Sequence, residues 1–595
     1  MHKRTRFPSV WGALGALLLV VGCGAQDGGS SPRSTPPRTP LPGPTPPPGP
    51  TSPTDFKCEA PCYLAFLTPA QAVVREQCSR EVVVQFERAP NEPLRQNRAV
   101  TLTLSGGESF YADAACTQPI SSVTIPAGES TAHYFFKEAT VGTVHHWVSA
   151  GGNYLASQLH TITDRQPSPG PLASTCRLQF PPAAGIPCGI DTPGTQYYVS
   201  ASRGDDGNPG TSAEHPWATL AHALQAAPDG STVRVAAGTY PESPEFEMAL
   251  RRPLTVKGGF DDTFSEWNPD RFHTTYSGPV TLMHDGATFG GFRLVARPPP
   301  DWLWALGYHR VQAGTLIRSY VEVIYSTRDT NYVMGVDVTA AEGRTSRVLC
   351  NDIYVRGATT FGFLALHALE LSSHSGTTEV SSNRICADHV PAPWMNEAIH
   401  SNGNCSSTNT PARITLTNNI IEVVQLNEDR GHVAAMHFSE CDSDMDVILT
   451  NNTVLSSRYG LSGGSNEGRG TTRWKLMNNI FFSEGSQRAA AGLGGQPILE
   501  SGGNLVFGYA DNRLLPAPAS SAADDTTGTA TAGTVFQDLT RGDFQPRQGG
   551  PAVGTGINVH GNTAYGAVTR DLAQRARPVD GAWDRGALLS PAAGD

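Results

Sequence analysis

The stretch LTNNIIEVV at residues 416–424 returns as LTNNTVLSS at residues 449–457. An Asn with apolar residues shortly after it recurs through this part of the chain, at Asn351, Asn383, Asn418, Asn451 and Asn478. Spacings of about 25 to 35 residues are typical of one turn of a solenoid with a loop of variable length. Asn tolerates the left-handed backbone of a tight corner, and its amide can bond to the same residue one turn away. The repeat therefore predicts stacked turns of short strands, with the apolar residue after each Asn pointing into a core.

A second repeat precedes each Asn and reads small, apolar, then polar. Its copies are GVDV (335–338), ALEL (368–371), AIHS (398–401), AMHF (435–438) and GLSG (460–463). Side chains alternate between the two faces of a strand, so the apolar member is expected to point inward and the polar member outward. Neighbouring turns lie about 4.8 Å apart. The pattern predicts a stripe of polar side chains on one outer face: Asp337, Glu370, His400, His437 and Ser462.

This stripe is the candidate functional site. An imidazole with a pKa near neutrality beside a carboxylate can exchange a proton or hold a cation. We assign His400, His437, Asp337 and Glu370 as candidate catalytic residues, and Ser462 as a candidate substrate-binding residue with Arg430 of the adjacent loop. No metal is assigned, and calcium is left open. The alternative interpretation is that outward positions of a sheet are simply polar.

The N-terminus predicts export. Lys3, Arg4 and Arg6 precede an apolar run at residues 11–21, which is shorter than the roughly 20 residues that span a bilayer. The run ends in LVVGC, which resembles the bacterial lipoprotein box. This resemblance implies a signal peptide over residues 1–23, a lipid on Cys23, and a place at the outer membrane or cell surface.

The next segments predict a stalk and a small sandwich. Residues 24–56 are rich in Pro, Thr, Ser and Gly, a composition that favours a disordered, extended stalk. Residues 57–164 contain short alternating segments separated by turn residues, which is typical of an antiparallel β-sandwich. This part resembles the immunoglobulin-like modules of bacterial surface proteins, in which Cys78 and Cys116 are candidates for a disulfide. Residues 165–195 are assigned as a linker.

The remaining cysteines are suited to disulfides. Of the 11 cysteines, the ten besides Cys23 are an even set, as expected outside the cytosol. Cys405 follows His400, and Cys441 follows His437, at nearly the same interval, so the two cysteines are expected to lie on adjacent turns within disulfide range. Further candidates are Cys176 and Cys188, whereas the pairing of four cysteines is left open: Cys58, Cys62, Cys350 and Cys386. A net charge of −11 excludes nucleic acid as a partner, because phosphate backbones need a positive field.

The opening and closing segments of residues 196–590 carry a family resemblance. DDGNPGT (205–211), a helix expected from Pro216, and STVRVAAGTY (231–240) resemble the domain of unknown function that opens many secreted bacterial right-handed parallel β-helices of the pectin-lyase-like group. The tail segments 543–557 and 575–588 resemble their closing segment. The resemblance implies an all-β chain with a parallel β-helix, opened by a short helix that covers its end.

The same resemblance implies a polysaccharide partner. Many such β-helices cleave polysaccharides, by lyase chemistry with a base and a neutralising cation, or by hydrolysis between carboxylates. The motifs of polygalacturonases and pectate lyases are missing, so whether this chain is a polysaccharide lyase or a glycoside hydrolase is left open. In a lyase, His400 or His437 would be the base, and Arg430 or an ion on Asp337 and Glu370 the neutraliser. The alternative function is a non-catalytic adhesin or structural surface protein, and the oligomeric state is open.

Overall fold

The computed structural model describes most of the chain after residue 62. The described residues are 63–68, 71–89, 92–150, 154–163, 188–241, 248–296, 309–325, 332–357, 365–371, 375–389, 395–401, 411–425, 432–438, 444–463, 470–493, 496–514, 524, 528–539 and 542–591. The predicted signal peptide, Cys23 and the predicted stalk lie outside them. Among the helices of the described ranges, none is long and apolar enough to cross a membrane.

The described residues between 63 and 163 form two β-sheets around an apolar core of their own. One sheet has the order β1-β3-β9-β6-β7 with β4 paired to β3, and the other has the order β2-β11-β10-β5-β8. The strands are β1 (Tyr63–Phe66), β2 (Ala72–Val74), β3 (Val82–Ala89), β4 (Glu92–Pro93), β5 (Val100–Ser105), β6 (Ser109–Tyr111), β7 (Pro119–Ile120), β8 (Ser122–Ile125), β9 (Thr131–Lys137), β10 (Gly142–Ala150) and β11 (Tyr154–Thr163). The disulfide between Cys78 and Cys116 is present, with Cα atoms 5.7 Å apart. The immunoglobulin-like resemblance of this sandwich stays a prediction.

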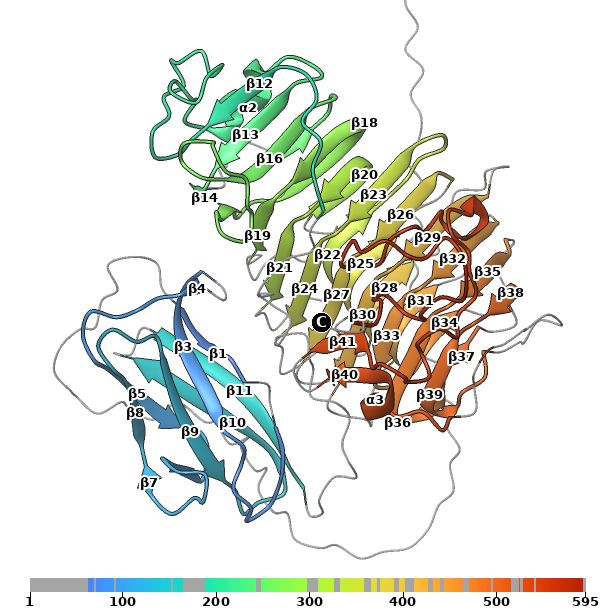
Figure 1. Ribbon diagram of the computed structural model, residues 1–595. Coiled ribbons are helices and arrows are strands. Elements are labelled where there is room, and N and C mark those ends of the chain that lie inside the picture. Colours follow the sequence, from blue (N-terminus) through green and yellow to red (C-terminus); the bar gives the residue numbers. More distant parts are fainter. Residues whose placement is uncertain are drawn as a thin grey trace, which may run out of the picture. The chain divides into compact units, whose positions relative to one another are not determined.

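From β12 onward the chain winds into a right-handed parallel β-helix, as predicted (Figure 1). Its strands form an 18-stranded sheet that covers two faces and a 10-stranded sheet that covers the third. The first turns use β12 (Gln196–Val199), β13 (Thr232–Ala236), β14 (Gly238–Tyr240), β15 (Met248–Leu250), β16 (Thr255–Phe260), β17 (Thr274–Tyr276), β18 (Val280–Gly290), β19 (Phe292–Ala296), β20 (His309–Ile317) and β21 (Tyr320–Tyr325).

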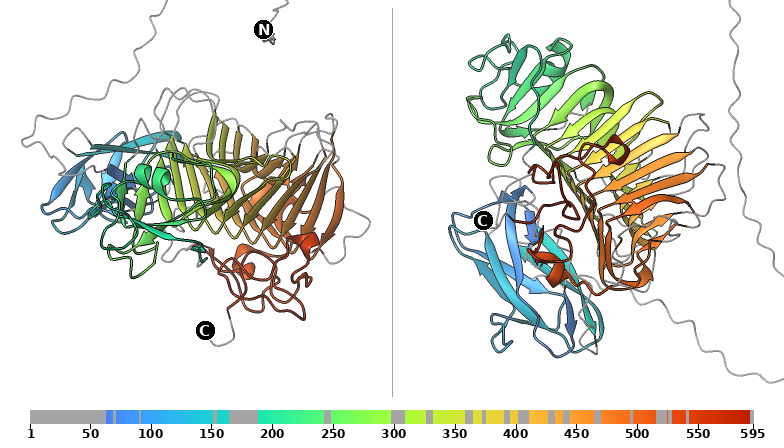
Figure 2. Two further views of the ribbon diagram at one scale, coloured as in Figure 1. Left: turned by 90° about the horizontal axis from the view of Figure 1, so that it is seen from above. Right: turned by 45° about the vertical axis from the view of Figure 1, so that its right-hand side comes forward.

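The later turns each contribute one strand to each of three faces, which stack in parallel (Figure 2). The first face consists of β22 (Tyr332–Val338), β25 (Ala365–Leu371), β28 (Met395–Ser401), β31 (His432–Phe438), β34 (Tyr459–Gly463) and β37 (Ala491–Gly492). The second consists of β23 (Thr345–Leu349), β26 (Thr377–Ser381), β29 (Ala412–Thr417), β32 (Met445–Thr450), β35 (Thr472–Met477) and β38 (Ile498–Gly502). The third consists of β24 (Asp352–Gly357), β27 (Arg384–His389), β30 (Ile420–Gln425), β33 (Thr453–Ser456), β36 (Ile480–Ala489) and β39 (Leu505–Asp511).

The Asn repeat forms a ladder inside the coil, between the second and third faces. Each ladder amide donates to Oδ1 of the Asn on the next turn, at 2.9 to 3.1 Å, over sequence separations of 25 to 36 residues. The ladder ends where Asn504 donates to Oδ1 of Asp524. Its members are fully buried: Asn351, Asn383, Asn419, Asn452, Asn479 and Asn504. Because each ladder amide is hydrogen-bonded to the next amide, to a backbone carbonyl or to the carboxylate of Asp524, these polar groups are satisfied inside an apolar core.

The two residues of each Asn-Asn pair have different roles, which corrects the prediction that one Asn serves both. Asn418, Asn451 and Asn478 are the left-handed corner residues, with φ of 53°, 56° and 56°, and the Asn after each is the ladder residue. The corner position is taken in earlier turns by Cys350 and Ser382. The residue that enters the core lies two positions after the ladder Asn and not directly after it: Ile353, Ile385, Ile421, Val454 and Phe481.

A short helix lies at the beginning of the β-helix, as predicted, but it starts later than expected. The helix α2 covers Leu220–Ala226, and Thr219 caps it by accepting a hydrogen bond from the backbone N of His222. Trp217 lies before the helix, bridges to Val199 of β12, and is buried in the same core as Leu220. Because Pro216 and Trp217 belong to this extended segment, the helix begins only where the Thr cap is available.

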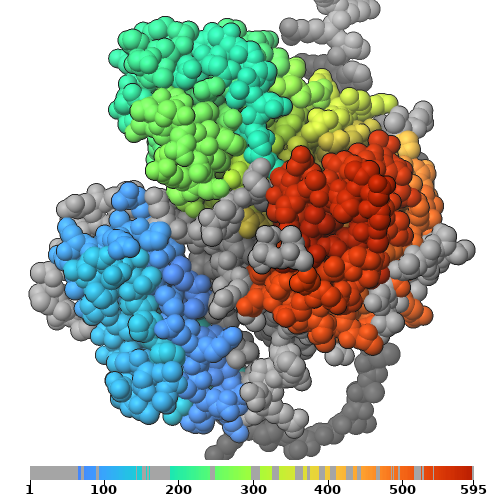
Figure 3. All heavy atoms as spheres, viewed as in Figure 1, coloured from blue at the N-terminus to red at the C-terminus, as the bar shows by residue number. Residues whose placement is uncertain are grey.

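Residues 528–539 and 542–591, here called the closing segment, lie against the outside of the later turns (Figure 3). The segment contains α3 (Ala532–Val535), β40 (Phe536–Asp538), β41 (Asp543–Pro546) and the 3₁₀ helix η2 (Thr563–Tyr565). The corner Asn residues hold it: Asn418 donates to Arg570 O at 2.8 Å, Asn451 to Asp584 O at 3.1 Å, and Asn478 to Ile557 O at 2.7 Å. The first Asn of each pair thus faces outward and the second inward.

Two further cysteine pairings bear on the predictions. Cys188 pairs with Cys350, 162 residues away, and thereby ties the start of the β-helix to a corner of its middle turns. Cys386 is also disulfide-bonded. Four cysteines lie outside the described residues, together with any pairing among them: Cys58, Cys62, Cys405 and Cys441. Cys176 lies outside them as well.

Candidate functional site

The predicted polar stripe lies in register on the first face of the β-helix. Asp337 of β22 is opposite Glu370 of β25, which is opposite His400 of β28. His400 is opposite His437 of β31, which is opposite Ser462 of β34. The apolar residues directly before them belong to the core, so the polar side chains lie on the outer side of the sheet, as predicted. The functional roles assigned to them stay predictions.

The exposure of the stripe differs from the prediction. Glu370 is 0% exposed, His400 and Ser462 are 4% exposed, and Asp337 is 8% exposed. His437 is partly exposed. An outward position on a sheet was expected to be a solvated one, whereas here most of the stripe is shielded from water. Buried ionisable groups are costly unless they are paired, so the contacts among these side chains decide what the site can do.

Two residues that the sequence interpretation missed complete the site. His367 of β25 and Glu397 of β28 are opposite each other, three residues before Glu370 and His400. Strict alternation would place residues three apart on opposite faces. The strand pairing, however, skips one small residue in every turn: Gly335, Ala368, Ala398, Ala435 and Gly460. A bulge is therefore stacked along the face, and side chains three residues apart, on either side of the bulge, lie on the same face.

The sequence does carry a signal for this bulge. The small residue occupies the same place in all five copies of the second repeat. A side chain at Gly335 would meet Cγ2 of Val355 at 2.4 Å and the backbone O of Ala368 at 2.7 Å, so there is little room at this copy of the position. A small residue that recurs at the same place in successive turns indicates a close approach of the backbones. It is therefore a reason to question strict alternation of the side chains there.

His367, Glu370, Glu397 and His400 form a compact group, here called the His–Glu cluster. Nδ1 of His367 and Nδ1 of His400 both lie 2.8 Å from Oε2 of Glu370. The Nε2 atoms of the same rings lie 3.4 Å and 3.8 Å from Oε2 of Glu397. The two rings are stacked, with centroids 4.2 Å apart and planes 25° apart. Each imidazole is therefore held between two carboxylates.

The charges in the cluster support each other. Burial alone would raise the pKa of Glu370, but the hydrogen bonds from His367 and His400 outweigh it and lower the pKa below its ordinary value. Burial alone would lower the pKa of His400, but the bond to Glu370 and the charge of Glu397 raise it above the usual histidine value. The site thus favours an ionised Glu370 in contact with a protonated His400.

His437 extends this group toward solvent. Its ring is stacked on His400, with centroids 5.5 Å apart and planes 11° apart. Its Nδ1 lies 2.8 Å from Oγ of Ser462, which fixes the orientation of the ring. Among the described residues of the stripe, His437 is the ionisable one that solvent reaches most readily. A molecule outside the protein would meet this imidazole before it met the His–Glu cluster.

The donors of the cluster fit some metals better than the calcium left open from sequence. His367, Glu397 and His400 each offer one ligand atom, and these atoms lie within 4.8 Å of one another. Calcium takes oxygen ligands only, whereas two of these three donors are imidazole nitrogens. Glu370 faces the two imidazoles. Calcium therefore does not suit the site.

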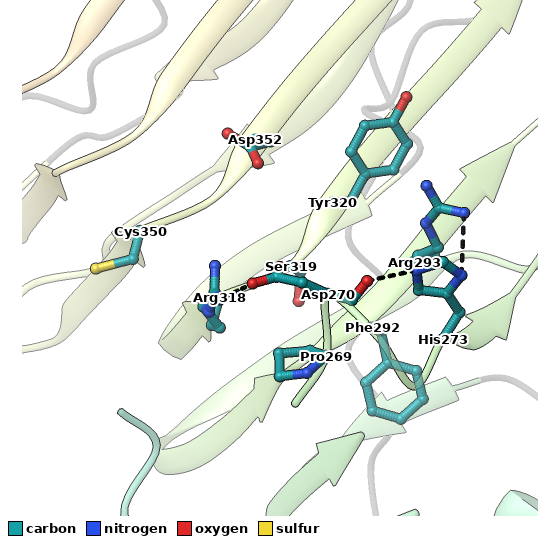
Figure 4. Close-up of a pocket in the computed structure, with 10 residues that line it drawn as sticks. All are labelled: Pro269, Asp270, His273, Phe292, Arg293, Arg318, Ser319, Tyr320, Cys350 and Asp352. Atoms are coloured by element: carbon teal, nitrogen blue, oxygen red, sulfur yellow. Dashed lines mark hydrogen bonds and ion pairs between the residues drawn. The ribbon is translucent and has the colours of Figure 1, made fainter. Parts of the chain in front are cut away.

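A small cavity of about 50 Å³ lies elsewhere, on the third face (Figure 4). Its charged groups are largely paired: Arg318 binds Asp270 at 2.6 Å, and Arg384 binds the lining residue Asp352. It has room for a few water molecules. None of the predicted site residues lines it. Of the remaining predicted site residues, Arg430 lies outside the described residues.

No family model and no curated protein matches this chain. Solved structures with a similar fold include pectate lyase Pel9A, with a TM-score of 0.35 and 13% identity over 68% of this chain and 99% of that chain. A rhamnogalacturonan lyase has a TM-score of 0.26 and 10% identity over 58% and 91%. The catalytic unit of a thermostable GH87 alpha-1,3-glucanase from Streptomyces thermodiastaticus strain HF3-3 has a TM-score of 0.22 and 11% identity over 78% and 96%. At this distance the similarity concerns the β-helix fold and carries no information on activity.

Proposed function

We propose that this chain is an exported lipoprotein, anchored through Cys23 at the outer membrane or cell surface, whose β-helix binds or processes a polysaccharide at the first face. The observation that supports a chemical role is the convergence of Glu370, His400 and His437 in one column, with the rings stacked and the carboxylate bound to an imidazole. An outer face that is polar only because it meets solvent does not need ionisable side chains that are paired and oriented in this way.

Within this proposal, His437 is the candidate base. It is partly exposed, and Ser462 orients its ring, so it can meet a polymer directly. In a lyase reaction the base takes the proton from the carbon beside a uronate carboxylate. A C=C bond then forms, and the neighbouring glycosidic C–O bond breaks, leaving its electron pair on the departing oxygen. The buried His400 and Glu370 position His437 through the ring stack.

Hydrolysis fits the site less well than lyase chemistry. A glycoside hydrolase places its two carboxyl groups on either side of the scissile bond. Glu370 and Glu397 are both 0% exposed and face the imidazoles of the cluster. A sugar ring therefore has no access between them in this arrangement, and we favour a lyase or a binding function.

The test is a degradation and binding screen with the full mature chain. A panel of neutral and uronate-containing polysaccharides is incubated with the wild type and with His437→Ala, and unsaturated products and reducing ends are measured. Glu379→Gln on the second face is the matched control, because Glu379 is a partly exposed carboxylate paired with Arg347. We expect turnover or binding of one polymer that His437→Ala loses and Glu379→Gln keeps. No binding and no turnover across the panel would contradict the proposal.

The burial of the cluster favours a second candidate function. Groups that are 0% and 4% exposed can simply join neighbouring turns, as a rigid rod for an adhesin or structural surface protein requires. In that case Glu370→Gln and His400→Ala lower thermal stability, while no variant on this face changes the binding of any polysaccharide.

The anchor has a test of its own. Cys23→Ser is expected to release the chain from the membrane fraction and to abolish incorporation of labelled fatty acid. If Cys23→Ser stays in the membrane fraction, the lipoprotein proposal is wrong.

A further inference from the structure

We propose that His367, Glu397 and His400 bind one divalent transition-metal ion, and that Glu370 orients both imidazoles for it. The site shares side chains with the proposed function but goes beyond it, because a bound ion is measured without any polysaccharide. The argument starts from the order of residues on two neighbouring strands.

The two strands carry mirrored motifs. Strand β25 reads His367-Ala-Leu-Glu370, and strand β28 reads Glu397-Ala-Ile-His400. The stacked bulge brings both ends of each motif to the same face, and the register sets His367 beside Glu397 and Glu370 beside His400. Imidazoles and carboxylates therefore alternate around a square of four side chains.

Glu370 determines which nitrogen of each ring faces Glu397. An ionised carboxylate only accepts hydrogen bonds, so His367 and His400 each donate Nδ1–H to the same oxygen, Oε2 of Glu370, at 2.8 Å. In a neutral imidazole the other nitrogen, Nε2, then carries the lone pair. Carboxylates that hold metal-binding histidines in this way are the usual outer partners of metal sites, because they set the tautomer and the ring orientation.

The two Nε2 atoms and one oxygen of Glu397 converge on one point. Nε2 of His367 lies 3.4 Å and Nε2 of His400 lies 3.8 Å from Oε2 of Glu397. Both distances exceed the usual range of an N–H···O hydrogen bond, about 2.7 to 3.2 Å. When both rings are neutral, two Nε2 lone pairs and the carboxylate of Glu397 face one point, and a cation bound there takes the place of the proton that the charged form of His400 carries. With metal–ligand bonds of about 2.0 to 2.1 Å in tetrahedral geometry, ligand atoms are about 3.3 Å apart. The 3.4 Å pair matches this spacing, the 3.8 Å pair must close slightly, and all three ligand atoms lie within 4.8 Å of one another.

The donor set also selects the class of ion. Two imidazole nitrogens and one carboxylate oxygen suit zinc, manganese, iron(II), cobalt and nickel. Calcium and magnesium prefer oxygen ligands alone. All three ligands are buried, at 0% for His367 and Glu397 and 4% for His400, and they come from neighbouring strands of a rigid sheet. The ligand atoms are thus preorganised, and only small side-chain movements are needed for binding.

The test measures metal on the full mature chain. The chain is stripped with a chelator, equilibrated separately with zinc, manganese, cobalt and nickel, and analysed by elemental analysis, titration calorimetry and the visible spectrum of the cobalt form. We expect one ion per chain, bound more tightly than calcium, and a rise in Tm. Glu397→Gln and His367→Ala are expected to abolish binding, and Glu370→Gln is expected to weaken it about 10- to 100-fold. His437→Ala, in the same stack but outside the ligand set, keeps it.

A second measurement distinguishes the loss of a metal ligand from the misfolding of a variant. X-ray absorption of the wild-type zinc form is expected to show two imidazole ligands, whatever the fate of the variants. A stripped wild type that takes up no ion, a zinc form without imidazole scattering, or unchanged affinity in Glu397→Gln with native circular dichroism would each overturn the inference. A chain that binds the ion but no polymer refutes the proposed function alone. A chain that degrades a polymer and binds no ion refutes this inference alone.

Discussion

Replacing Asn452 by Ala removes the middle of the Asn ladder. The amide of Asn452 donates to Leu416 O at 2.9 Å and to Oδ1 of Asn479 at 3.0 Å. Its own Oδ1 accepts from the backbone N of Asn419 at 3.0 Å and from the side-chain N of Asn419 at 2.9 Å. In the variant, Leu416 O, the backbone N–H of Asn419 and one side-chain N–H of Asn419 each lose this partner, in an interior where these residues are fully buried. The oxygen Oδ1 of Asn479 keeps a hydrogen bond from the backbone N of residue 452.

The expected cost follows from these three groups. A buried polar group that loses its partner costs about 1 to 3 kcal/mol, and part of this is recovered by relaxation, so we expect a loss of about 3 to 5 kcal/mol in the free energy of unfolding. The matched control is Asn451→Gly, one residue earlier. Gly accepts the left-handed corner at φ 56°, so this variant loses the outward bonds to Asp584 O and Gly586 O and a long 3.5 Å bond from Nδ2 of Asn478. We expect about 1 kcal/mol for the control.

Urea unfolding of the full chain separates the two variants. Far-ultraviolet circular dichroism reports the strands, and tryptophan fluorescence reports Trp474 in the core and Trp583 in the closing segment, both of which are fully buried. The Asn452→Ala midpoint is expected to fall well below that of Asn451→Gly. Equal midpoints would refute the division of roles within the Asn-Asn pairs.

Three further predictions concern the rest of the β-helix. Burial lowers the pKa of His309 from 6.5 to about 3, so between these values the unfolded chain binds a proton that the folded chain does not. Stability present at neutral pH is therefore lost as the pH falls through this window, and His309→Gln is expected to flatten the decline in Tm; an unchanged slope would contradict this. Arg577 is buried and donates to Oδ1 of Asn418 at 2.9 Å and to Gly586 O at 2.8 Å. Arg577→Met is expected to cost about 3 kcal/mol and to speed hydrogen exchange in the closing segment, and unchanged exchange there would argue against a fastening role. The Cys188–Cys350 disulfide closes a loop of 162 residues; the double variant Cys188→Ala, Cys350→Asn is expected to lose up to about 5 kcal/mol by the chain-entropy relation, and a Tm equal to that of the wild type would refute this.

Much of the architecture could be predicted because it rests on local rules. A strand alternates its side chains, a parallel turn repeats every 4.8 Å or so, and an Asn suits both a left-handed corner and an amide stack. Applied to the repeat, these rules predict that Glu370, His400 and His437 lie in one column, and the strand register confirms it. The same rules could not divide the roles of Asn418 and Asn419, because which of two neighbours faces inward depends on the corner geometry of the folded turn.

The sequence by itself determined the class of fold, the interval of the coil and the column of the candidate site. Only the tertiary structure decided that His367 and Glu397 join that column, that the column is buried, that Cys188 pairs with Cys350, and that the first Asn of each pair holds the closing segment. The physical reason is one of range. Periodicity arises between residues that are adjacent in the chain, whereas a stacked bulge, solvent exposure and a partner 162 residues away depend on segments that meet only after the coil has closed.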